Sequence, residues 1–313
     1  MKKFLSVLPA FLLLGCGRAE DEYRPPVWTV TAKVVDEEEK PIANAIVKIW
    51  WHVHPGEGQT IAMTNRTGLT GSEGLFRVTQ RSGSIEVMCE ATKDGYYSCG
   101  RTHEFGKFRE ADPAKWNPTV TLLLKKIGRP VAMYARLVEN GPPKFNEPIG
   151  YDLMAGDWVA PYGKGTSADM FFTGNLDKRS EFDSDYKLVV NFPNTGDGVQ
   201  DFTLSEVEKG SVLQSGHDAP ETGFLSQWVQ TVKRRPGQAM MTDRDENRRY
   251  YFRVRTMLDQ NGNVKSALYG KIYGDFMQFR YYLNPTPNDR NVEFDPKRNL
   301  MKNLQSFEQV SAP

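Results

Sequence analysis

Hydrophobic and polar residues alternate along much of the first third of the chain. In segment 27–35 the hydrophobic residues on one side are Trp28, Val30, Ala32 and Val34. Segment 45–53 has the same period of two: one side holds Ala45, Val47, Ile49, Trp51 and Val53, and the other holds Ile46, Lys48, Trp50 and His52. This period is typical of a β-strand with one buried face. We therefore predict strands over 27–35 and 45–53, and further short strands over 75–79, 84–92 and 120–124.

Turn-forming residues separate these segments. Residues 36–41 hold an acidic turn and a proline, residues 70–74 read Thr-Gly-Ser-Glu-Gly, and Lys93-Asp94-Gly95 is a strong hairpin signal. Short strands at regular spacing, without helical periodicity, are typical of an antiparallel β-sandwich. We expect this sandwich to span residues 27–126.

The rest of the chain, residues 127–313, predicts a second β-rich domain. Strands are expected over 131–137, 187–191, 249–259 and 264–276, the last two joined by a hairpin turn at 260–263. Segment 221–235 has hydrophobic residues at helical spacing and ends before Pro236-Gly237, which predicts a short helix. The stretch 138–186 is rich in loops, and the tail 284–299 shows no regular pattern. The expected fold class is mainly β with one or two short helices.

The first fifteen residues have the pattern of an export signal. Lys2 and Lys3 precede an apolar run, 4–14, that is shorter than the about twenty residues of a membrane-spanning helix. The run ends in Leu13-Leu14-Gly15-Cys16, which resembles the lipobox of bacterial prolipoproteins. We expect residues 1–15 to be removed, Cys16 to carry acyl chains such as palmitate, and residues 16–26 to form a tether. An ordinary signal peptide that contains a cysteine is the alternative.

A lipid on Cys16 would determine where the protein resides. Several acyl chains on one residue anchor a protein stably in a bilayer. Gly17 follows the cysteine, at a position where an aspartate would indicate retention at the inner membrane. We therefore expect a cell-envelope protein held to a membrane by its N-terminal lipid, and held to the outer membrane if the cell is Gram-negative.

Charge gives no reason to expect a nucleic-acid partner. The formal net charge is +1, and loss of Lys2 and Lys3 with the signal peptide leaves it close to zero. A nearly neutral chain has no overall field that attracts nucleic acid. The sequence also has no Walker motif and no dinucleotide-binding glycine pattern, so we expect no cofactor.

Cys89 and Cys99 remain once Cys16 is assigned to the lipid. In an oxidising envelope an isolated pair of cysteines usually forms a disulfide. The two residues flank the Asp94-Gly95 turn, so a bridge between them would close a hairpin. We predict this disulfide, and two free structural thiols are the alternative.

Several stretches of the first domain resemble the carboxypeptidase regulatory-like domain. They are Val34-Val35-Asp36, segments 41–47 and 70–76, and Lys93-Asp94-Gly95-Tyr96-Tyr97. That family has a transthyretin-like, seven-stranded sandwich and is common in bacterial envelope proteins. It contributes no catalytic residues and usually serves as a stalk, spacer or docking module. The resemblance therefore implies a structural role for this third of the chain.

Part of the same region is also similar to intradiol ring-cleavage dioxygenases, which share the sandwich. The similarity rests on segment 45–50 and on Thr67-Gly68. Those enzymes bind non-haem iron through two tyrosines and two histidines, and their His-x-His segment lies downstream of these residues. In this chain the corresponding stretch, near 85–89, is followed by no histidine before His103. The ligand pattern is broken, which disfavours an iron enzyme.

The His-x-His segment of this chain is His52-Val53-His54, upstream of that place. Residues two apart on a strand project from the same face, about 6.5 Å apart at the backbone, and this spacing can chelate a metal. A metal site needs three or four ligands, however, and Pro55-Gly56 ends the strand directly after His54. His52 and His54 are therefore candidate metal ligands, with an ordinary strand end as the alternative.

The hairpin predicted over 249–276 offers a candidate binding surface. On one side of its two strands lie Arg253 and Arg255, and Tyr269, Lys271 and Tyr273. Basic and aromatic side chains together suit stacking on sugars or contact with anionic glycans. These five residues are therefore candidate ligand-binding residues, although a solvated outer face of a two-sided sheet is the more common arrangement.

Acidic residues of the loop-rich stretch are a second group of candidates. Asp152, Asp157 and Asp169 have the residue type of a glycosidase acid pair, and they equally suit the capping of turns. His217, next to Asp218, has no nucleophile in view. Segments 156–165 and 266–276 resemble an uncharacterised companion region in envelope proteins of planctomycete- and verrucomicrobia-type bacteria.

Together these observations predict a lipid-anchored envelope protein without catalytic activity. The first domain would be a spacer or docking sandwich, and the second would bind a glycan or a protein partner. The alternative function is an envelope hydrolase or a metal-dependent enzyme that uses the acidic loop or the pair His52 and His54. Purely structural work is the third interpretation.

Overall fold

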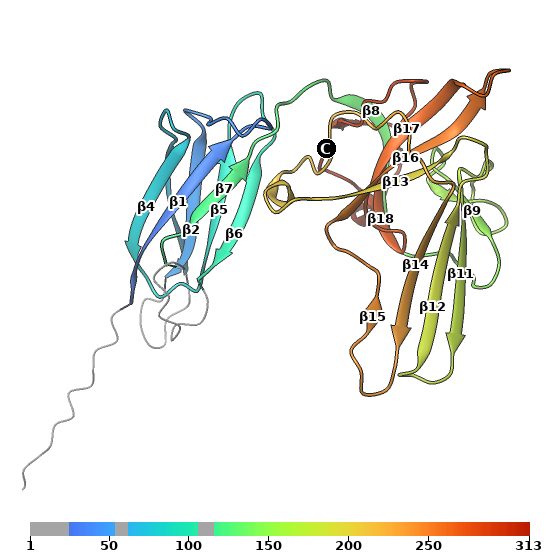
Figure 1. Ribbon diagram of the computed structural model, residues 1–313, viewed down its shortest axis with the longest axis horizontal. Helices are drawn as coiled ribbons and strands as arrows, with labels where there is room; N and C mark the ends of the chain where they lie inside the picture. The colour runs from blue at the N-terminus through green and yellow to red at the C-terminus, as the bar shows by residue number, and fades with distance from the viewer. Residues whose placement is uncertain (1–24, 54–61, 106–115) are drawn as a thin grey trace, which may run out of the picture.

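Strands make up most of the regular structure, as the hydrophobic alternation predicted (Figure 1). The computed structural model describes residues 25–53, 62–105 and 116–313. Two 3-10 turns are present, η1 (Glu208–Gly210) and η2 (Ser306–Glu308). Within the described residues, no helix combines the length and the apolar character needed to cross a membrane. The mainly β fold class is confirmed.

The first domain is a sandwich of two sheets with strand orders β4-β1-β7 and β3-β2-β5-β6. Its strands are β1 (Val27–Val35), β2 (Ile46–Val53), β3 (Ala62–Leu69), β4 (Leu75–Arg81), β5 (Glu86–Thr92), β6 (Cys99–Glu104) and β7 (Thr119–Leu123). Neighbouring strands are antiparallel except β1 and β7, which run parallel. Strand β3 was missed in the sequence because its residues lack a hydrophobic alternation.

Side chains that alternate along β1 and β2 fill the space between these two sheets. Trp28 is fully buried, meets Trp51 edge to face at 5.5 Å between ring centroids, and stacks on Phe105 at 5.6 Å. Aromatic pairs at such separations add to the stabilisation from burying apolar area. The inner faces predicted for segments 27–35 and 45–53 are therefore confirmed.

The second domain packs two six-stranded sheets face to face, with orders β10-β9-β11-β12-β14-β15 and β13-β16-β17-β18-β8-β19. The first sheet comprises β9 (Ile149–Asp152), β10 (Asp157–Trp158), β11 (Met170–Lys178), β12 (Ser184–Asn191), β14 (Gln227–Arg234) and β15 (Met241–Thr242). The second comprises β8 (Val131–Val138), β13 (Gly198–Thr203), β16 (Arg248–Leu258), β17 (Val264–Asp275), β18 (Gln278–Asn284) and β19 (Phe294–Asn299). Buried aromatic residues such as Phe172, Phe252 and Phe279 lie between the sheets.

Irregular chain covers the opposite face of the second sheet. Tyr269 on β17 packs with Ala219 and Val292, which come from loops before β14 and before β19. Farther along β17, Tyr273 packs in a cluster with Val310. This sheet is therefore buried on both faces, which the alternation along β16 and β17 did not reveal.

Segment 221–235 is not a helix. Its residues 227–234 form β14, which pairs with β12 from Gln227 opposite Asn191 to Arg234 opposite Ser184. Trp228 and Val232 are four residues apart, a spacing that places side chains on one side of a strand as well as of a helix. The predicted helix is wrong because that spacing fits both periods.

The tail also has more structure than its pattern indicated. Residues Phe294–Asn299 form β19, a strand that runs parallel to β8 at the edge of the second sheet. Pro296 lies within this strand, and proline is tolerated at a sheet edge because its missing N–H faces no partner. The strand was not predicted because its proline and charged residues give no hydrophobic alternation.

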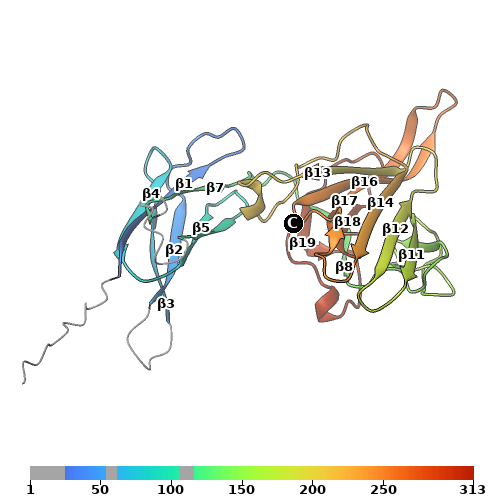
Figure 2. The ribbon, with the colours of Figure 1, turned by 60° about the horizontal axis from the view of Figure 1, so that its bottom comes forward.

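The domains meet in a joint formed by the loop that contains η1 and by the connection between β7 and β8 (Figure 1, Figure 2). The N–H of Val212 donates to the carbonyl of Ser98 at 3.1 Å, and Cys99 and Ser211 form a β-bridge. Lys125, which is 4% exposed, donates from Nζ to the carbonyl of Ser215 at 2.9 Å. The second domain thus extends the β6 edge of the first through main-chain hydrogen bonds.

Candidate functional site

The predicted basic and aromatic face on β16 and β17 is not a surface. Lys271 is fully buried, and Tyr269 and Tyr273 are each 5% exposed. The segments that cover this side of the sheet, described above, exclude solvent from all three side chains. The prediction of an exposed ligand-binding face there is therefore wrong.

Lys271 lies among polar and aromatic groups with no carboxylate partner in the described chain. Its Nζ donates to Ser215 Oγ at 3.1 Å and lies 5.0 Å from the ring centroids of both Tyr273 and Tyr282. Burial, with Lys125 nearby as a second cause, lowers the pKa of Lys271 well below its usual value. A buried amine of this kind belongs to the packing of the domain and not to a binding surface.

The two arginines of that face make structural bonds. Arg253 donates from Nε to the carbonyl of Gly196 at 2.6 Å, and its guanidinium lies 4.9 Å from the ring centroid of Phe224. Arg255 sits in the left-handed region (φ 56°) where β16 has an irregular register, and donates from Nε to Asp169 at 2.7 Å. The bulge turns Arg255 toward the acids of the other sheet, so it leaves the face on which alternation would place it.

The acidic candidates of the loop-rich stretch cap turns. Asp152 accepts N–H bonds from Met154, Ala155, Thr166 and Ser167, and Asp157 accepts those of Trp158 and Lys164. Burial would raise the pKa of Asp152, but these backbone donors and Arg255 lower it below its usual value. Asp169, 1% exposed, has a pKa raised by burial although Arg255 and the N–H of Leu153 oppose the shift. The arrangement fixes loops and offers no free acid pair.

Neither histidine candidate belongs to a described metal site. His52 lies 3.6 Å from a carboxylate oxygen of Glu86, while His54 lies outside the described residues. Over 25–53, 62–105 and 116–313, no group of three or more His, Cys, Asp or Glu residues could hold a metal ion. His217 pairs with Glu37 of the first domain at 3.2 Å and with the buried Glu293 of the second, so it belongs to the joint.

The predicted disulfide between Cys89 and Cys99 does not form, and both cysteines are free and buried. In the β5–β6 pairing Cys89 faces Arg101 and Cys99 faces Ala91, so the cysteines are two positions out of register. Diagonal neighbours of this kind lie farther apart than directly facing residues, beyond the reach of most disulfides. Burial raises the pKa of Cys89 to about 12 and that of Cys99 to about 11. The disulfide prediction is wrong for this register, and the thiols belong to the core. Cys16 lies outside the described residues.

An exposed hydrophobic surface lies on the outer side of the β3-β2-β5-β6 sheet. We call it the outer face and define it by Ile46, Trp50, Met63, Leu69 and Met88. Ile46 faces Leu69 across β2 and β3, and Trp50 faces Met88 across β2 and β5. Four of these side chains are 40–59% exposed, and Trp50 is half-buried. A one-sided antiparallel sheet normally presents polar residues to water, so this apolar outer face needs an explanation.

Trp50 stands at the centre of the outer face. The ammonium of Lys48 lies 3.8 Å from the ring centroid of Trp50, so a cation already covers one face of the indole. The indole Nε1 is buried and has no hydrogen-bond partner within the described chain. Alternation in the sequence placed Ile46 and Trp50 on the polar side of their strand. Hydrophobic residues on that side were the sequence pattern from which this surface could have been predicted.

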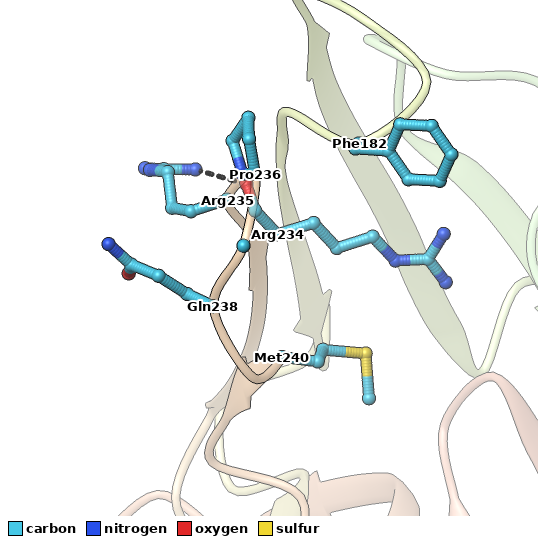
Figure 3. A pocket seen from close by; sticks show the side chains of 7 residues that line it. Phe182, Arg234, Arg235, Pro236, Gln238 and Met240 are labelled. Carbon is cyan, nitrogen blue, oxygen red and sulfur yellow. Dashed lines mark hydrogen bonds between the residues drawn. The ribbon is translucent and has the colours of Figure 1, made fainter.

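A second exposed feature is the pair of hairpin tips at the end of the β11–β12 and β14–β15 hairpins. A cavity of about 460 Å³ there is lined by Phe182, Arg234, Arg235, Pro236, Gly237, Gln238 and Met240. Figure 3 shows the side chains of Phe182, Arg234 and Met240 extending to one side, and those of Arg235 and Gln238 to the other. Phe182 is 65% exposed and Met240 53%. Sequence reasoning missed this feature because residues 221–235 were predicted as a helix.

Comparison with known proteins finds only distant similarity to solved structures. No protein-family model and no curated protein matches the chain. Solved structures with some similarity include 3-chlorocatechol 1,2-dioxygenase from Rhodococcus opacus 1CP (13% identity, 34% of this chain and 62% of that chain, TM-score 0.26). Others are a streptococcal ancillary pilin (13%, 72% and 52%, 0.23) and the shaft pilin SpaA from Lactobacillus rhamnosus GG (10%, 86% and 95%, 0.25).

These similarities define no family. The chain spans 62% of the dioxygenase chain and 52% of the ancillary pilin chain. Fold and exposed surfaces together define a class of protein in broad terms: two packed β-sandwich domains with a fixed joint. The candidate arginines and aspartates of the second domain, and His217, form hydrogen bonds or ion pairs within the fold.

Proposed function

We propose that this protein is a non-catalytic docking protein of the bacterial cell envelope, anchored by lipid on Cys16, that binds a protein partner through the outer face of its first domain. The observation that carries the proposal is the outer face itself, with five large apolar side chains on neighbouring strands. Exposed patches of this kind on a folded domain mark sites of association. The resemblance of the first domain to a spacer and docking module supports the same role.

The chemistry of the outer face favours a protein over a glycan. Sugar stacking requires an open aromatic ring, and Lys48 already lies over the ring of Trp50. The remaining members of the face, such as Ile46, Leu69 and Met88, are aliphatic or thioether side chains on a flat sheet. Such side chains complement apolar side chains of another protein. Glu86 and Glu90 lie beside them on β5, where Glu86 is 3.6 Å from His52 and Glu90 faces Lys48 across β2 and β5. These acids therefore have basic neighbours within the face, and its apolar residues are what it offers a partner.

The joint supports this role because it holds the second domain against the first. Main-chain bonds between Ser98 and Val212 and the buried Lys125 link the domains on the edge formed by β6 and β7. The outer face lies on the same sheet as β6 but is formed by β2, β3 and β5, which the joint leaves free. Docking therefore requires no separation of the domains.

Substitution of the outer face is expected to abolish partner binding without unfolding the protein. The variant is Ile46→Ser/Leu69→Ser/Met88→Ser, and each position is at least 40% exposed. Exposed substitutions usually change stability by less than about 0.5 kcal/mol each, so the fold should persist. The measurement is capture of proteins from solubilised envelope of the source organism by the purified wild type and by the variant, with thermal unfolding as a check on folding.

Phe307→Ser provides the matched control, because Phe307 is 57% exposed on η2 of the second domain. We expect the same proteins with the wild type and the control, and at least a ten-fold loss with the triple variant. Equal capture by all three proteins would refute the outer face as the docking surface. If the wild type alone self-associates in sedimentation experiments, the partner is a second copy of this chain.

Lipidation gives an independent test of the cellular location. Cys16→Ser is expected to abolish labelling with radioactive palmitate and to leave the chain unprocessed or released from the membrane fraction, because the acyl chains supply the anchoring energy. The measurement is labelling and fractionation in a bacterial host with lipoprotein-processing enzymes. Cys99→Ser is the control and should be labelled like the wild type. Unchanged labelling of Cys16→Ser would overturn the lipoprotein assignment.

A further inference from the structure

The hairpin tips of the second domain combine exposed apolar and cationic side chains. Phe182, Met240 and Met241 are 65%, 53% and 48% exposed. Arg234 is exposed and extends to the same side as Phe182 and Met240 (Figure 3), and no carboxylate in the described chain pairs with its guanidinium. We propose that these four residues, called the membrane tip, contact the surface of an anionic phospholipid bilayer.

Charge at the two hairpins supports an anionic occupant. Asp177, Asp183 and Asp185 pair with Arg179 or Arg235, and these two guanidiniums offset two of the three carboxylates. Lys178, Lys233 and Arg234 add three positive charges and Glu181 one negative charge, so these residues of the described tips carry a net formal charge of +1. Cations close to a membrane surface are attracted to anionic lipid headgroups.

The tips are held in place before any ligand arrives. Arg235, at the end of β14, donates from Nη2 to both oxygens of Asp185 on β12, at 2.8 and 3.1 Å. Arg179 pairs with the same Asp185 at 3.0 Å and with Asp183 at 2.7 Å. This network links the two hairpins, and networks contribute more than isolated surface pairs. Phe182 and Met240 are thus presented side by side with little ordering required on binding.

The position of the tips relative to the start of the first domain selects a bilayer as the occupant. In Figure 1 the beginning of β1 and the ends of the β11–β12 and β14–β15 hairpins lie on the lower side of the molecule. Between Cys16 and Pro25 the chain can span about 30 Å at most when fully extended. If Cys16 carries the lipid, as in the proposed function, the same side of the protein stays near the membrane, and the membrane tip faces it.

The test measures binding of the mature chain without its lipid. Residues 16–313 carrying Cys16→Ser are mixed with vesicles of phosphatidylcholine alone, or of phosphatidylcholine with phosphatidylglycerol, and floated on a density gradient. We expect the chain to float with the anionic vesicles. Phe182→Ser/Met240→Ser/Met241→Ser and Arg234→Gln should each lower the bound fraction at least five-fold, because they remove the apolar or the cationic part of the contact. Phe307→Ser is the control and should float like the wild type.

A fluorescence measurement keeps the proposal testable if the triple variant fails to fold. Phe182→Trp places an indole at the tip, and its emission should shift to shorter wavelength when anionic vesicles are added. Absence of both flotation and this shift would overturn the proposal, as would equal flotation of the wild type and the Arg234→Gln variant. Release of the wild type from vesicles by inorganic phosphate at constant ionic strength would assign the tip to a free anion and would also overturn it. Because the chain carries no lipid and no partner is present, these outcomes are independent of the tests of the proposed function.

Discussion

The substitution Lys271→Met is expected to raise the free energy of unfolding at pH 7 by about 2 kcal/mol, because a buried apolar side chain avoids the cost of removing an amine and its charge from water. Lys271 is fully buried and its amine has one hydrogen-bond acceptor, Ser215 Oγ. Loss of the amine leaves Ser215 satisfied, since its hydroxyl donates to the carbonyl of Gly216 and accepts from Tyr273. Methionine is also unbranched and can follow the same path between Tyr273 and Tyr282.

The stabilisation should depend on pH with a defined sign. The pKa of Lys271 is lowered in the folded protein, whereas in the unfolded chain it is about 10.4. Unfolding therefore takes up a proton below that value, and the wild type becomes more stable as the pH rises toward 10. The advantage of Lys271→Met should consequently shrink from pH 7 to pH 10, by at most about 1.4 kcal/mol per pH unit.

Denaturant unfolding of both proteins at pH 7, 8.5 and 10 measures this difference. Lys265→Met is the control, because Lys265 is exposed on the same strand and should change stability little at any pH. A Lys271→Met protein less stable than the wild type at pH 7, or an advantage of the variant that grows with pH, would contradict the assignment of Lys271 as a buried, largely uncharged amine.

Glu293→Ala is expected to destabilise the second domain by about 1–2 kcal/mol and to loosen the joint, since it removes the acceptor of the Gly128 N–H and one of the two carboxylates that pair with His217. The carboxylate of Glu293 is fully buried, pairs with His217 and accepts the N–H of Gly128 at 3.1 and 3.2 Å. A Cβ at Gly128 would lie 2.7 Å from a carboxylate oxygen of Glu293, so glycine allows this close approach. The bonds join the connection between the domains to the loop that carries His217.

Calorimetry can measure the loss of stability, and small-angle X-ray scattering can measure the loosening of the joint. The wild type should unfold in one transition and scatter as a single shape, whereas Glu293→Ala should show an earlier transition and a larger radius of gyration. Glu221→Ala is the matched control, because the Glu221 side chain is 76% exposed and makes one ion pair, with Arg290. If Glu293→Ala melts at the same temperature as the wild type and has the same radius of gyration, this carboxylate does not secure the joint.

Much of the fold could be predicted from hydrophobic alternation. Trp28 and Val47 are buried on the predicted inner faces, and the hairpin at 260–263 joins β16 to β17 as expected. The errors have physical causes. A spacing of four residues, as in Trp228 and Val232, fits both a strand and a helix, and a proline at a sheet edge concealed β19.

The predicted binding surface failed for a different reason. Alternation tells which residues share a face of β17, but whether that face meets water depends on chain far away in the sequence. Ala219 and Val292 cover Tyr269, and nothing in the local pattern of β17 indicates them. The acidic residues were better defined, since Asp152 and Asp157 stand beside loops whose N–H groups they accept. The outer face was visible in the sequence as Ile46 and Trp50 on the polar side of a strand.

The β-bridge between Cys99 and Ser211 also bears on how the protein is made. On the proposed export route the chain crosses the membrane from its N-terminus onward, and about 110 residues separate the two partners, so β6 emerges before the segment that completes its edge. During this interval the first sandwich can fold with an open strand edge, which is a template for pairing with other chains. A chaperone that shields strand edges would find its substrate in this interval, and the arrival of Ser211 would end the exposure.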